Sequence, residues 1–435
     1  MTRQSTTPDN SHGGDSDDGS AAFMLPGVPP MRDTLDGWQQ YCAAYGTFVP
    51  APHLDLATWQ AMPARQRTLG DLHRAATHAN LPLQETPMSQ AVATLVRGRI
   101  DSNALKRKPT TRAGVIVTGG GNQGKTETVC AIAAAFETDW RMLHAHIHPG
   151  ALAGVRDRWA PVAYAQTPVT AKPKSLCKAI LNFYGAPTKG MDLPDLVAQV
   201  AASLTDHGTK VLILDDISRL RMHRADDQDV LDLLRAFMSM HVTLVLIGVD
   251  VPGSGLLHEG RPGGHLGQRL LPGLPPAQVR GLEATQTQRR FDLIELGPFR
   301  YDTPAQITAW TQHLAGIETQ LRLMNATPGM LTAATMPEYL FRRTDGVVGL
   351  LERLIEDGCG HAIAAGVERL TQTLLDGVVL NAAGNDTAAS KSLRAAAQPD
   401  QPVKPEEPPG KGKGKRRRGR NTAFDDNGQA GETPA

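Results

Sequence analysis

The chain has 435 residues, of which 40% are hydrophobic and 20% are charged, so it is long and apolar enough to build two packed domains. Aromatic residues make up only 5%, which argues against a stacking surface for single-stranded nucleic acid. The polar N-terminus lacks the apolar core of a secretory signal, and no apolar run approaches membrane-spanning length. The four cysteines lie far apart, which is typical of reduced thiols. We therefore expect a cytoplasmic protein with no membrane partner.

The formal net charge of +1 conceals a strongly basic tail. Seven lysines and arginines lie between residues 411 and 420, so the rest of the chain carries −6, which is +1 less these seven. A flexible cationic segment favours salt-dependent, sequence-independent contact with DNA phosphates. The alternative is a solvated linker that presents the apolar and acidic residues 424–426 as a docking peptide for a partner.

The predicted elements begin after a disordered N-terminus, residues 1–22, which is rich in Ser, Asp, Gly and Thr. Residues 23–105 show helical periodicity. From residue 106 onward short apolar runs alternate with helical patterns, which predicts an α/β fold with a parallel sheet covered by helices on both faces. The predicted strands are 114–118, 162–165, 211–214, 243–247 and 293–296, and the predicted helices among them are 126–136, 174–184, 193–205 and 230–240.

The end of the chain differs from this α/β core. Residues 301–385 contain only helical patterns, and residues 386–435 return to Ala, Pro, Gly and charge, which predicts a disordered basic tail. We therefore place the α/β core at 106–300 and an all-helical domain at 301–385. Within the core, the Gly- and Pro-rich stretch 251–281 is predicted to be a flexible loop.

The segment from Gly119 to Thr126 reads GGGNQGKT and fits the phosphate-binding pattern G-x-x-x-x-G-K-[ST]. Glycines let successive backbone N–H groups face the phosphates, the lysine reaches the β- and γ-phosphates, and the threonine hydroxyl ligates Mg²⁺. A strand is predicted before the pattern and a helix after it. This context favours a phosphate-binding loop over the alternative, a Gly-rich turn with an incidental lysine. The predicted nucleotide ligands are Gly119, Gly121, Asn122, Gln123, Gly124, Lys125 and Thr126.

Two adjacent acids end the predicted strand 211–214. Such carboxylates repel each other unless a cation lies nearby, so Asp215 is predicted to hold Mg²⁺ together with Thr126. Asp216 is predicted to orient the attacking water. An ordinary polar turn is the alternative. A guanine-reading N-K-x-D pattern is missing at every predicted strand end, which favours ATP over GTP as the cofactor.

The order of these features resembles the AAA+ ATPases with their helical lid, and within that class the TniB family of transposition ATPases. Besides the phosphate-binding loop, the likeness is carried by ILDDI at 213–217, IGVD at 247–250, QRRF at 288–291, and the stretches 339–349 and 421–428. The resemblance implies an ATPase that forms a homo-oligomeric ring or filament on duplex DNA. It also implies a protein that recruits or activates a transposase.

The resemblance assigns two further roles. Asp250 would be a sensor of the γ-phosphate, although a turn residue before a proline is the alternative. Arg290, with Arg289 close behind it, would be the arginine finger that acts on the nucleotide of a neighbouring copy, although a surface pair without a role is the alternative. The sequence departs from the AAA+ pattern at Asp216, where glutamate is usual, and at Gly349, where a sensor arginine is common.

Two other functions stay open. A helicase loader or replication initiator would have the same fold, and a signalling ATPase would change its oligomeric state without touching DNA. A cluster of basic and histidine residues follows the two acids, and it would either face DNA in the channel of a ring or form a solvated loop; its members are Arg219, Arg221, His223 and Arg224.

Overall fold

The computed structural model describes residues 29–150, 158–169, 172–219, 226–252 and 288–380. The predicted disordered ends, the docking peptide and nearly all of the predicted loop lie outside these ranges, as do Arg221, His223 and Arg224 of the cluster that follows the two acids. Among the helices of the described ranges, none combines the length and apolar character that a bilayer crossing requires.

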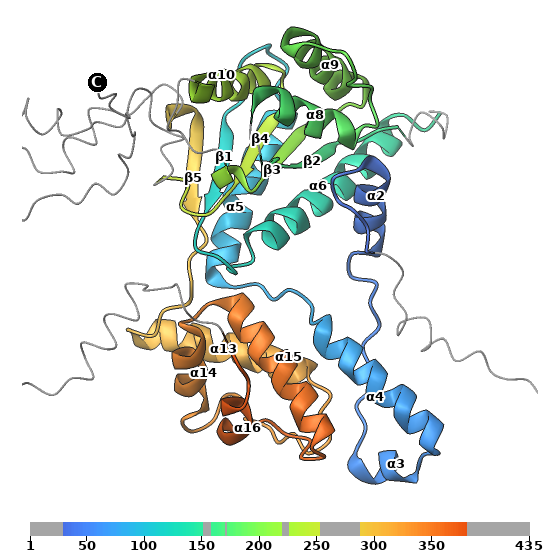
Figure 1. The fold of residues 1–435 in the computed structure, drawn as a ribbon, viewed down its shortest axis with the longest axis vertical. Helices are drawn as coiled ribbons and strands as arrows, with labels where there is room; N and C mark the ends of the chain where they lie inside the picture. The colour runs from blue at the N-terminus through green and yellow to red at the C-terminus, as the bar shows by residue number, and fades with distance from the viewer. Residues whose placement is uncertain (1–28, 151–157, 170–171, 220–225, 253–287, 381–435) are drawn as a thin grey trace, which may run out of the picture. The chain divides into compact units, whose positions relative to one another are not determined.

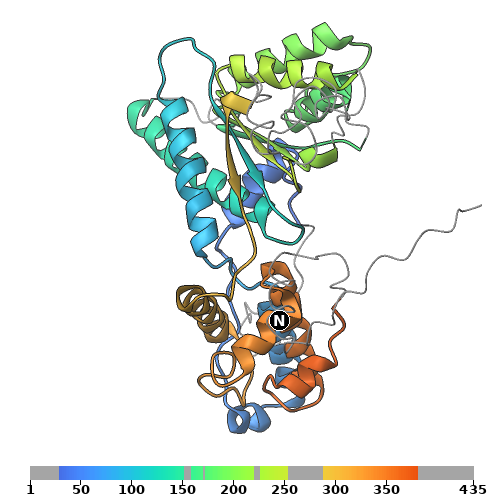
Figure 2. The same ribbon diagram turned by 90° about the vertical axis from the view of Figure 1, so that its left-hand side faces the viewer.

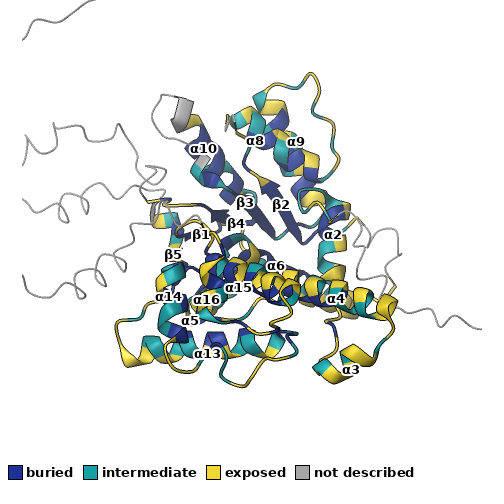
Figure 3. Ribbon diagram, turned by 60° about the horizontal axis from the view of Figure 1, so that its bottom comes forward, coloured by how far each residue is buried: buried dark blue, intermediate teal, exposed yellow. Residues whose placement is uncertain are grey.

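The core is a five-stranded parallel sheet with the strand order β2-β3-β4-β1-β5 (Figure 1). Every residue of β1, β3 and β4 is buried, because both faces of a parallel sheet are covered by helices (Figure 3). The predicted α/β fold is confirmed. The strands are β1 (Gly114–Thr118), β2 (Val162–Gln166), β3 (Val211–Asp215), β4 (Thr243–Ile247) and β5 (Phe291–Glu295).

Helices α5 (Pro87–Ala104) and α6 (Lys125–Ile147) cover one face of the sheet (Figure 2). On α5 the side chains of Val92, Val96 and Ile100 recur every four residues and are fully buried, so they form the stripe that packs on the sheet. Helix α6 extends eleven residues past the predicted end at 136. The other face is covered by α8 (Pro173–Phe183) and α10 (Asp226–Ser239), with α9 (Leu193–Asp206) packed on α8.

A second, all-helical part follows β5, as predicted. Its centre is built by Trp310, Leu314 and Ile317, which lie on one face of α13 and are buried. The indole of Trp310 donates a hydrogen bond of 2.9 Å to the Pro337 carbonyl, so even its polar edge is satisfied. The helices are α13 (Pro304–Gln320), α14 (Met336–Thr344), α15 (Val348–Ala364) and α16 (Gln372–Asp376).

The N-terminal helices attach to both parts, which the sequence pattern did not predict. Helix α2 (Leu35–Ala44) packs on β2 and buries Trp38 completely. Helix α4 (Ala64–Ala79) packs against α15, where Arg74 forms a 2.7 Å ion pair with Glu368. Both of these charged side chains are buried, with exposed fractions of 2% and 6%. The short helix α3 (Leu56–Ala61) has no buried residue.

Candidate nucleotide-binding site

The phosphate-binding loop joins β1 to α6 and takes a conformation that demands glycine at two positions. Gly119 has φ +151°, and a Cβ there would collide with the carbonyl oxygen of Leu296. Gly124 has φ +74° and is the residue from which α6 starts. Asn122 also adopts a left-handed conformation, with φ +56°. The loop therefore ends at a helix N-terminus, where unpaired N–H groups attract anions.

Lys125 is the first residue of α6 and is 92% buried, with 8% of its surface exposed. Its ammonium group donates a hydrogen bond to the Gly120 carbonyl, so it folds back over the loop. Burial lowers the pKa of Lys125, while the negative charges of Asp215 and Asp216 act in the opposite direction. A buried cation that bonds to the backbone of the loop is well placed to meet a polyphosphate.

The carboxylate of Asp215, at the carboxyl end of β3, accepts three hydrogen bonds. The hydroxyl groups of Thr126 and Tyr164 donate to its Oδ2 atom, at 2.9 and 2.7 Å, and the backbone N–H of Asp216 donates to its Oδ1 atom at 2.8 Å. A carboxylate beside a threonine hydroxyl is an oxygen-rich pair of the kind that Mg²⁺ prefers. The donor set therefore fits Mg²⁺ that is also bound by phosphates.

Asp216 has φ +55°, which is unusual for a residue other than glycine. Its side chain is half-buried and accepts a hydrogen bond of 3.2 Å from the Gln166 amide at the end of β2. Left-handed backbone at a non-glycine residue costs about 1–2 kcal/mol, and such strain gathers at functional sites. The turn directs the two adjacent acids to different partners.

A cavity of about 270 Å³ joins the loop to the two acids. Gly121 through Glu127 line one side, Asp215 and Asp216 line another, and residues 247–249 at the end of β4 complete it. The predicted ligands from Gly121 to Thr126 are thus brought together with the predicted metal ligand.

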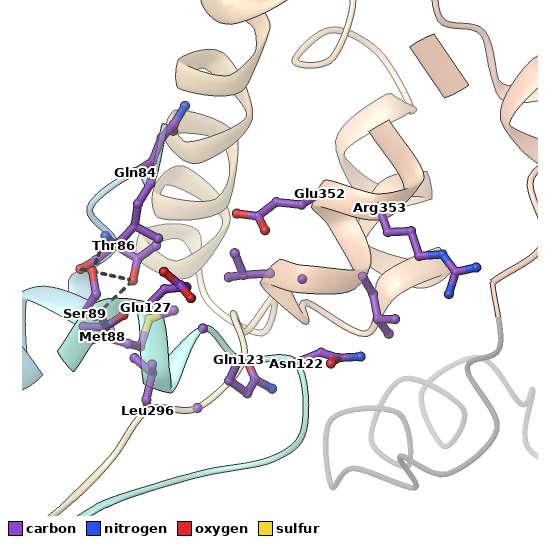
Figure 4. A pocket seen from close by; sticks show the side chains of 17 residues that line it. Gln84, Thr86, Met88, Ser89, Asn122, Gln123, Glu127, Leu296, Glu352 and Arg353 are labelled. Atoms are coloured by element: carbon purple, nitrogen blue, oxygen red, sulfur yellow. Dashed lines mark hydrogen bonds between the residues drawn. The ribbon is translucent and has the colours of Figure 1, made fainter. Parts of the chain in front are cut away.

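A second cavity of about 360 Å³ adjoins the loop (Figure 4). It is lined by Asn122, Gln123 and Gly124, by the start of α5 with its preceding residues, and by the start of α15. Glu127 and Glu352 lie on facing elements around this cavity in Figure 4. Burial, and then the charge of Glu127, raise the pKa of the Glu352 carboxyl group.

The helical part touches the phosphate-binding loop directly at Gly349. Its backbone N–H donates a hydrogen bond of 2.9 Å to the carbonyl of Asn122. A Cβ on Gly349 would lie 2.8 Å from that same oxygen, so no larger side chain fits without displacement. The glycine found where AAA+ proteins often have a sensor arginine is therefore explained by a close approach of two backbones. Arg353, one turn later, lines the same cavity and is 58% exposed.

Three predicted site residues line neither cavity: Gly119, at the start of the loop, Asp250 and Arg290. Asp250 is exposed and follows the cavity-lining residues of β4. Arg290 is half-buried in the short 3₁₀ helix η2 (Gln288–Arg290), directly before β5. Because Gly114 pairs with Phe291, this arginine lies at the edge where β1 starts, whereas the loop follows the opposite end of β1. Five residues of strand separate the two edges by about 16 Å.

Sequence reasoning missed the two β2 residues that contact the acids. Tyr164 and Gln166 are two apart, and Gln166 is the register partner of Asp215. The predicted strand at 162–165 held a usable signal, since parallel strands end at the same edge and their last residues meet there. What the sequence lacked was the strand order that makes β2 the neighbour of β3.

A family model of the AAA domain matches residues 107–250. No curated protein matches the chain. Among solved structures, ORC1 of Aeropyrum pernix in complex with DNA has a TM-score of 0.44 at 15% identity and covers 69% of this chain and 67% of its own. AMPPCP-bound DnaA of Aquifex aeolicus has a TM-score of 0.33 at 12% identity, with coverage of 66% and 65%. A RuvB variant of Thermotoga maritima has a TM-score of 0.34 at 14% identity, with coverage of 66% and 66%.

These three structural scores lie below 0.5, so the assignment rests on the family match and on the sheet that carries the loop. The match covers the stretch from the segment before β1 to the end of β4, which contains the phosphate-binding loop and both acids. Residues 107–250 therefore form an AAA domain, and the chain is a P-loop ATPase of AAA+ architecture.

Proposed function

We propose that this ATPase binds and hydrolyses ATP with Mg²⁺, and that the bound nucleotide controls its assembly on duplex DNA for transposition, as in the TniB family. The observation that carries the nucleotide part is the hydrogen bond between Thr126 and Asp215 next to the buried Lys125. The bond joins the phosphate-binding loop to the acid of β3 and forms the pair that a magnesium ion bound to phosphates requires.

Each residue of the smaller cavity has a defined task in this proposal. Lys125 and the loop N–H groups hold the phosphates, and Thr126 with Asp215 would hold Mg²⁺. Bound there, the metal ion would neutralise charge on the phosphates. Asp216 orients the attacking water, and its strained backbone and the Gln166 amide fix the direction of its carboxylate. Its side chain is shorter than the usual glutamate, so we expect slow turnover.

The larger cavity is the proposed site of the base and ribose. It shares the loop residues Asn122 to Gly124 with the smaller cavity, so one nucleotide can occupy both. Its other walls come from the helical part and from the start of α5. Because Gly349 bonds to the loop itself, nucleotide in this cavity would influence how the helical part, which acts as a lid, sits on the loop.

The position of Arg290 supports a role in trans. It lies at the sheet edge opposite the loop of its own chain, so it can serve only the nucleotide of another copy. An arginine that reaches a neighbour's γ-phosphate makes hydrolysis depend on assembly into a ring or filament. Asp250, three residues after the end of β4, is the proposed γ-phosphate sensor.

The proposed binding to DNA and to a transposase rests on features of the sequence. The seven cations between residues 411 and 420 supply phosphate contacts, and the TniB-like segments supply the link to a transposase. A helicase loader or replication initiator would also bind DNA but would not affect a transposase. A signalling ATPase would assemble without DNA.

Calorimetry tests the nucleotide site directly. Wild-type protein should bind ATP with Mg²⁺, and Lys125→Ala should lose at least about 100-fold in affinity, because removing a charge-assisted contact from a buried site costs several kcal/mol. Lys178→Ala is the matched control, since this lysine is exposed on α8. Equal binding by Lys125→Ala and the control would refute the site.

Negative-stain microscopy with duplex DNA tests the assembly. We expect ATP-dependent rings or filaments on the DNA, weaker DNA affinity after deletion of residues 410–435, and capture of the transposase only by the assembled form. ATP-dependent assembly that ignores DNA would favour the signalling ATPase. DNA assembly without any effect on a transposase would favour the initiator.

The finger role has its own test in hydrolysis rates. Arg290→Ala should hydrolyse ATP like wild type at protein concentrations too low for assembly, and should lose the rate increase that assembly brings. An assembled Arg290→Ala protein with the wild-type rate would show that this arginine is a surface residue.

A further inference from the structure

Tyr164 reaches the proposed metal ligand from outside the nucleotide-binding motifs. It lies on β2 with 6% of its surface exposed, and its hydroxyl donates a 2.7 Å hydrogen bond to Oδ2 of Asp215. The same oxygen accepts a hydrogen bond from the Thr126 hydroxyl, and Thr126 and Asp215 are the two residues that would hold Mg²⁺ in the proposed site. Tyr164 therefore donates to this oxygen although it does not belong to the nucleotide-binding loop.

The ring of Tyr164 is held by a segment far away in the sequence. The Trp38 ring lies parallel to it within 9°, at a centroid distance of 6.2 Å. The guanidinium carbon of Arg32 lies 5.9 Å from the Tyr164 ring centroid. Both residues precede the AAA domain, and neither is needed to complete the phosphate-binding loop.

Two hydrogen bonds tie this segment to α6, the helix that starts at the loop. Arg32 donates to Glu127 at 2.8 Å, and the Trp38 indole donates to Glu137 at 2.8 Å. Glu137 is 2% exposed, so its bond to Trp38 is shielded from water. The segment 32–38 therefore bridges α6 and Tyr164, and its two anchors lie on the same helix as Lys125 and Thr126.

We propose that Tyr164 is a positioning residue that fixes the carboxylate of Asp215 for Mg²⁺, and that segment 32–38 keeps Tyr164 in that place. The proposal rests on the nucleotide site described above. A carboxylate whose two oxygens are both held by donors does not need to be reoriented when the metal ion arrives. Loss of a partner that orients a metal ligand typically weakens metal binding about 10- to 100-fold.

Tyr164→Phe is the direct test, because it removes the hydroxyl and keeps the ring. The measurement is the Mg²⁺ concentration that gives half of the thermal stabilisation produced by a non-hydrolysable ATP analogue, with hydrolysis rates as a second measurement. We expect the Mg²⁺ requirement to rise about tenfold, with hydrolysis recovered at saturating Mg²⁺. Tyr184→Phe is the control, since its hydroxyl bonds to Thr209 at 2.8 Å, away from the acids.

A double-mutant cycle tests the segment. Trp38→Phe should raise the Mg²⁺ requirement in the wild-type background and should have no further effect on it in the Tyr164→Phe background. An unchanged Mg²⁺ requirement in Tyr164→Phe, or an equal change in Tyr184→Phe, would overturn the positioning role. Additive effects of the two substitutions would overturn the role of the segment. If wild type itself shows no stabilisation by the analogue with Mg²⁺, the nucleotide site fails, which is a distinct result.

Discussion

Replacing Arg74 by methionine should destabilise the protein far more than replacing an exposed arginine. Arg74 lies on α4 and donates through both terminal nitrogens to Glu368, at 2.7 and 3.1 Å. It also donates a hydrogen bond of 2.6 Å to the Asp71 carboxylate and one of 3.1 Å to the Arg322 carbonyl. Methionine keeps much of the aliphatic stem and removes the charge, so the packing loss is small compared with the electrostatic loss.

The magnitude follows from what is left behind. Glu368 is 6% exposed and also accepts a hydrogen bond of 3.1 Å from the Met324 N–H, so in Arg74→Met we expect its carboxylate to keep this one donor and to lose its buried cation. Breaking a buried ion pair by removing one partner costs about 3–5 kcal/mol. Arg97 is the comparison, since it pairs with Asp101 and Asp139 at 32% exposure, and losing such a surface pair costs about 0–1 kcal/mol.

Urea denaturation measures the difference. The free energy of unfolding is compared among wild type, Arg74→Met and Arg97→Met, with two optical probes that must give the same transition. A further variant, Arg74→Met with Glu368→Gln, should recover most of the loss, because glutamine carries no charge and can still accept from the Met324 N–H.

Two results would refute this reasoning. Arg74→Met could prove as stable as Arg97→Met, which would mean that the ion pair is solvated in the protein. The double variant could also be no more stable than Arg74→Met, which would mean that the loss comes from packing and not from an unpaired buried charge.

Two further predictions concern the lid and the response to acid. Gly349→Ala should weaken ATP binding about tenfold, because the added Cβ would lie 2.8 Å from the Asn122 oxygen. Gly360→Ala, on the same helix, is the control, since a Cβ there meets no atom within 4 Å. Equal ATP affinities of the two variants by calorimetry would contradict the prediction. Burial, and then two nearby arginine charges, lower the pKa of His78 from 6.5 to about 4, and its Nε2 accepts the Arg322 N–H. As the pH falls, His78 is therefore protonated in the unfolded chain before it is protonated in the folded one. The contribution of neutral His78 to the free energy of unfolding is fully present above pH 6.5, and up to about 3 kcal/mol of it is lost as the pH approaches 4. His78→Gln should reduce the dependence of the free energy of unfolding on pH, measured with urea. An unchanged slope would mean that other groups cause the pH dependence.

The strands and the loop could be predicted because their signals are local. β1 and β4 begin and end at the predicted residues, since each is a short apolar run bounded by turn residues. The end of α6 was wrong because the prediction stopped where the alanines stop. The next eleven residues contain neither glycine nor proline, Glu137 and Arg141 bond to Trp38 and to the Trp159 carbonyl, and Trp140 stacks on Phe136 one turn earlier, so the helix continues.

The contacts of the site could not be predicted in the same way, because they depend on which strands are neighbours. Tyr164 and Gln166 meet the two acids only because β2 lies beside β3. The partner of Gly349 is Asn122, which is more than 200 residues away and on another part of the fold. Nothing in the local sequence around either residue encodes that meeting.

The attachment of the N-terminal helices has a practical consequence for expressing the protein in pieces. A fragment trimmed to the family match at 107–250 would lose α5 and α2, and with them Val92, Val96, Ile100 and Trp38, all fully buried. The apolar surface of β1 and β4 beneath α5 would then meet water, which invites aggregation. We expect an isolated catalytic domain to be recovered in usable form only when it starts upstream of Arg32.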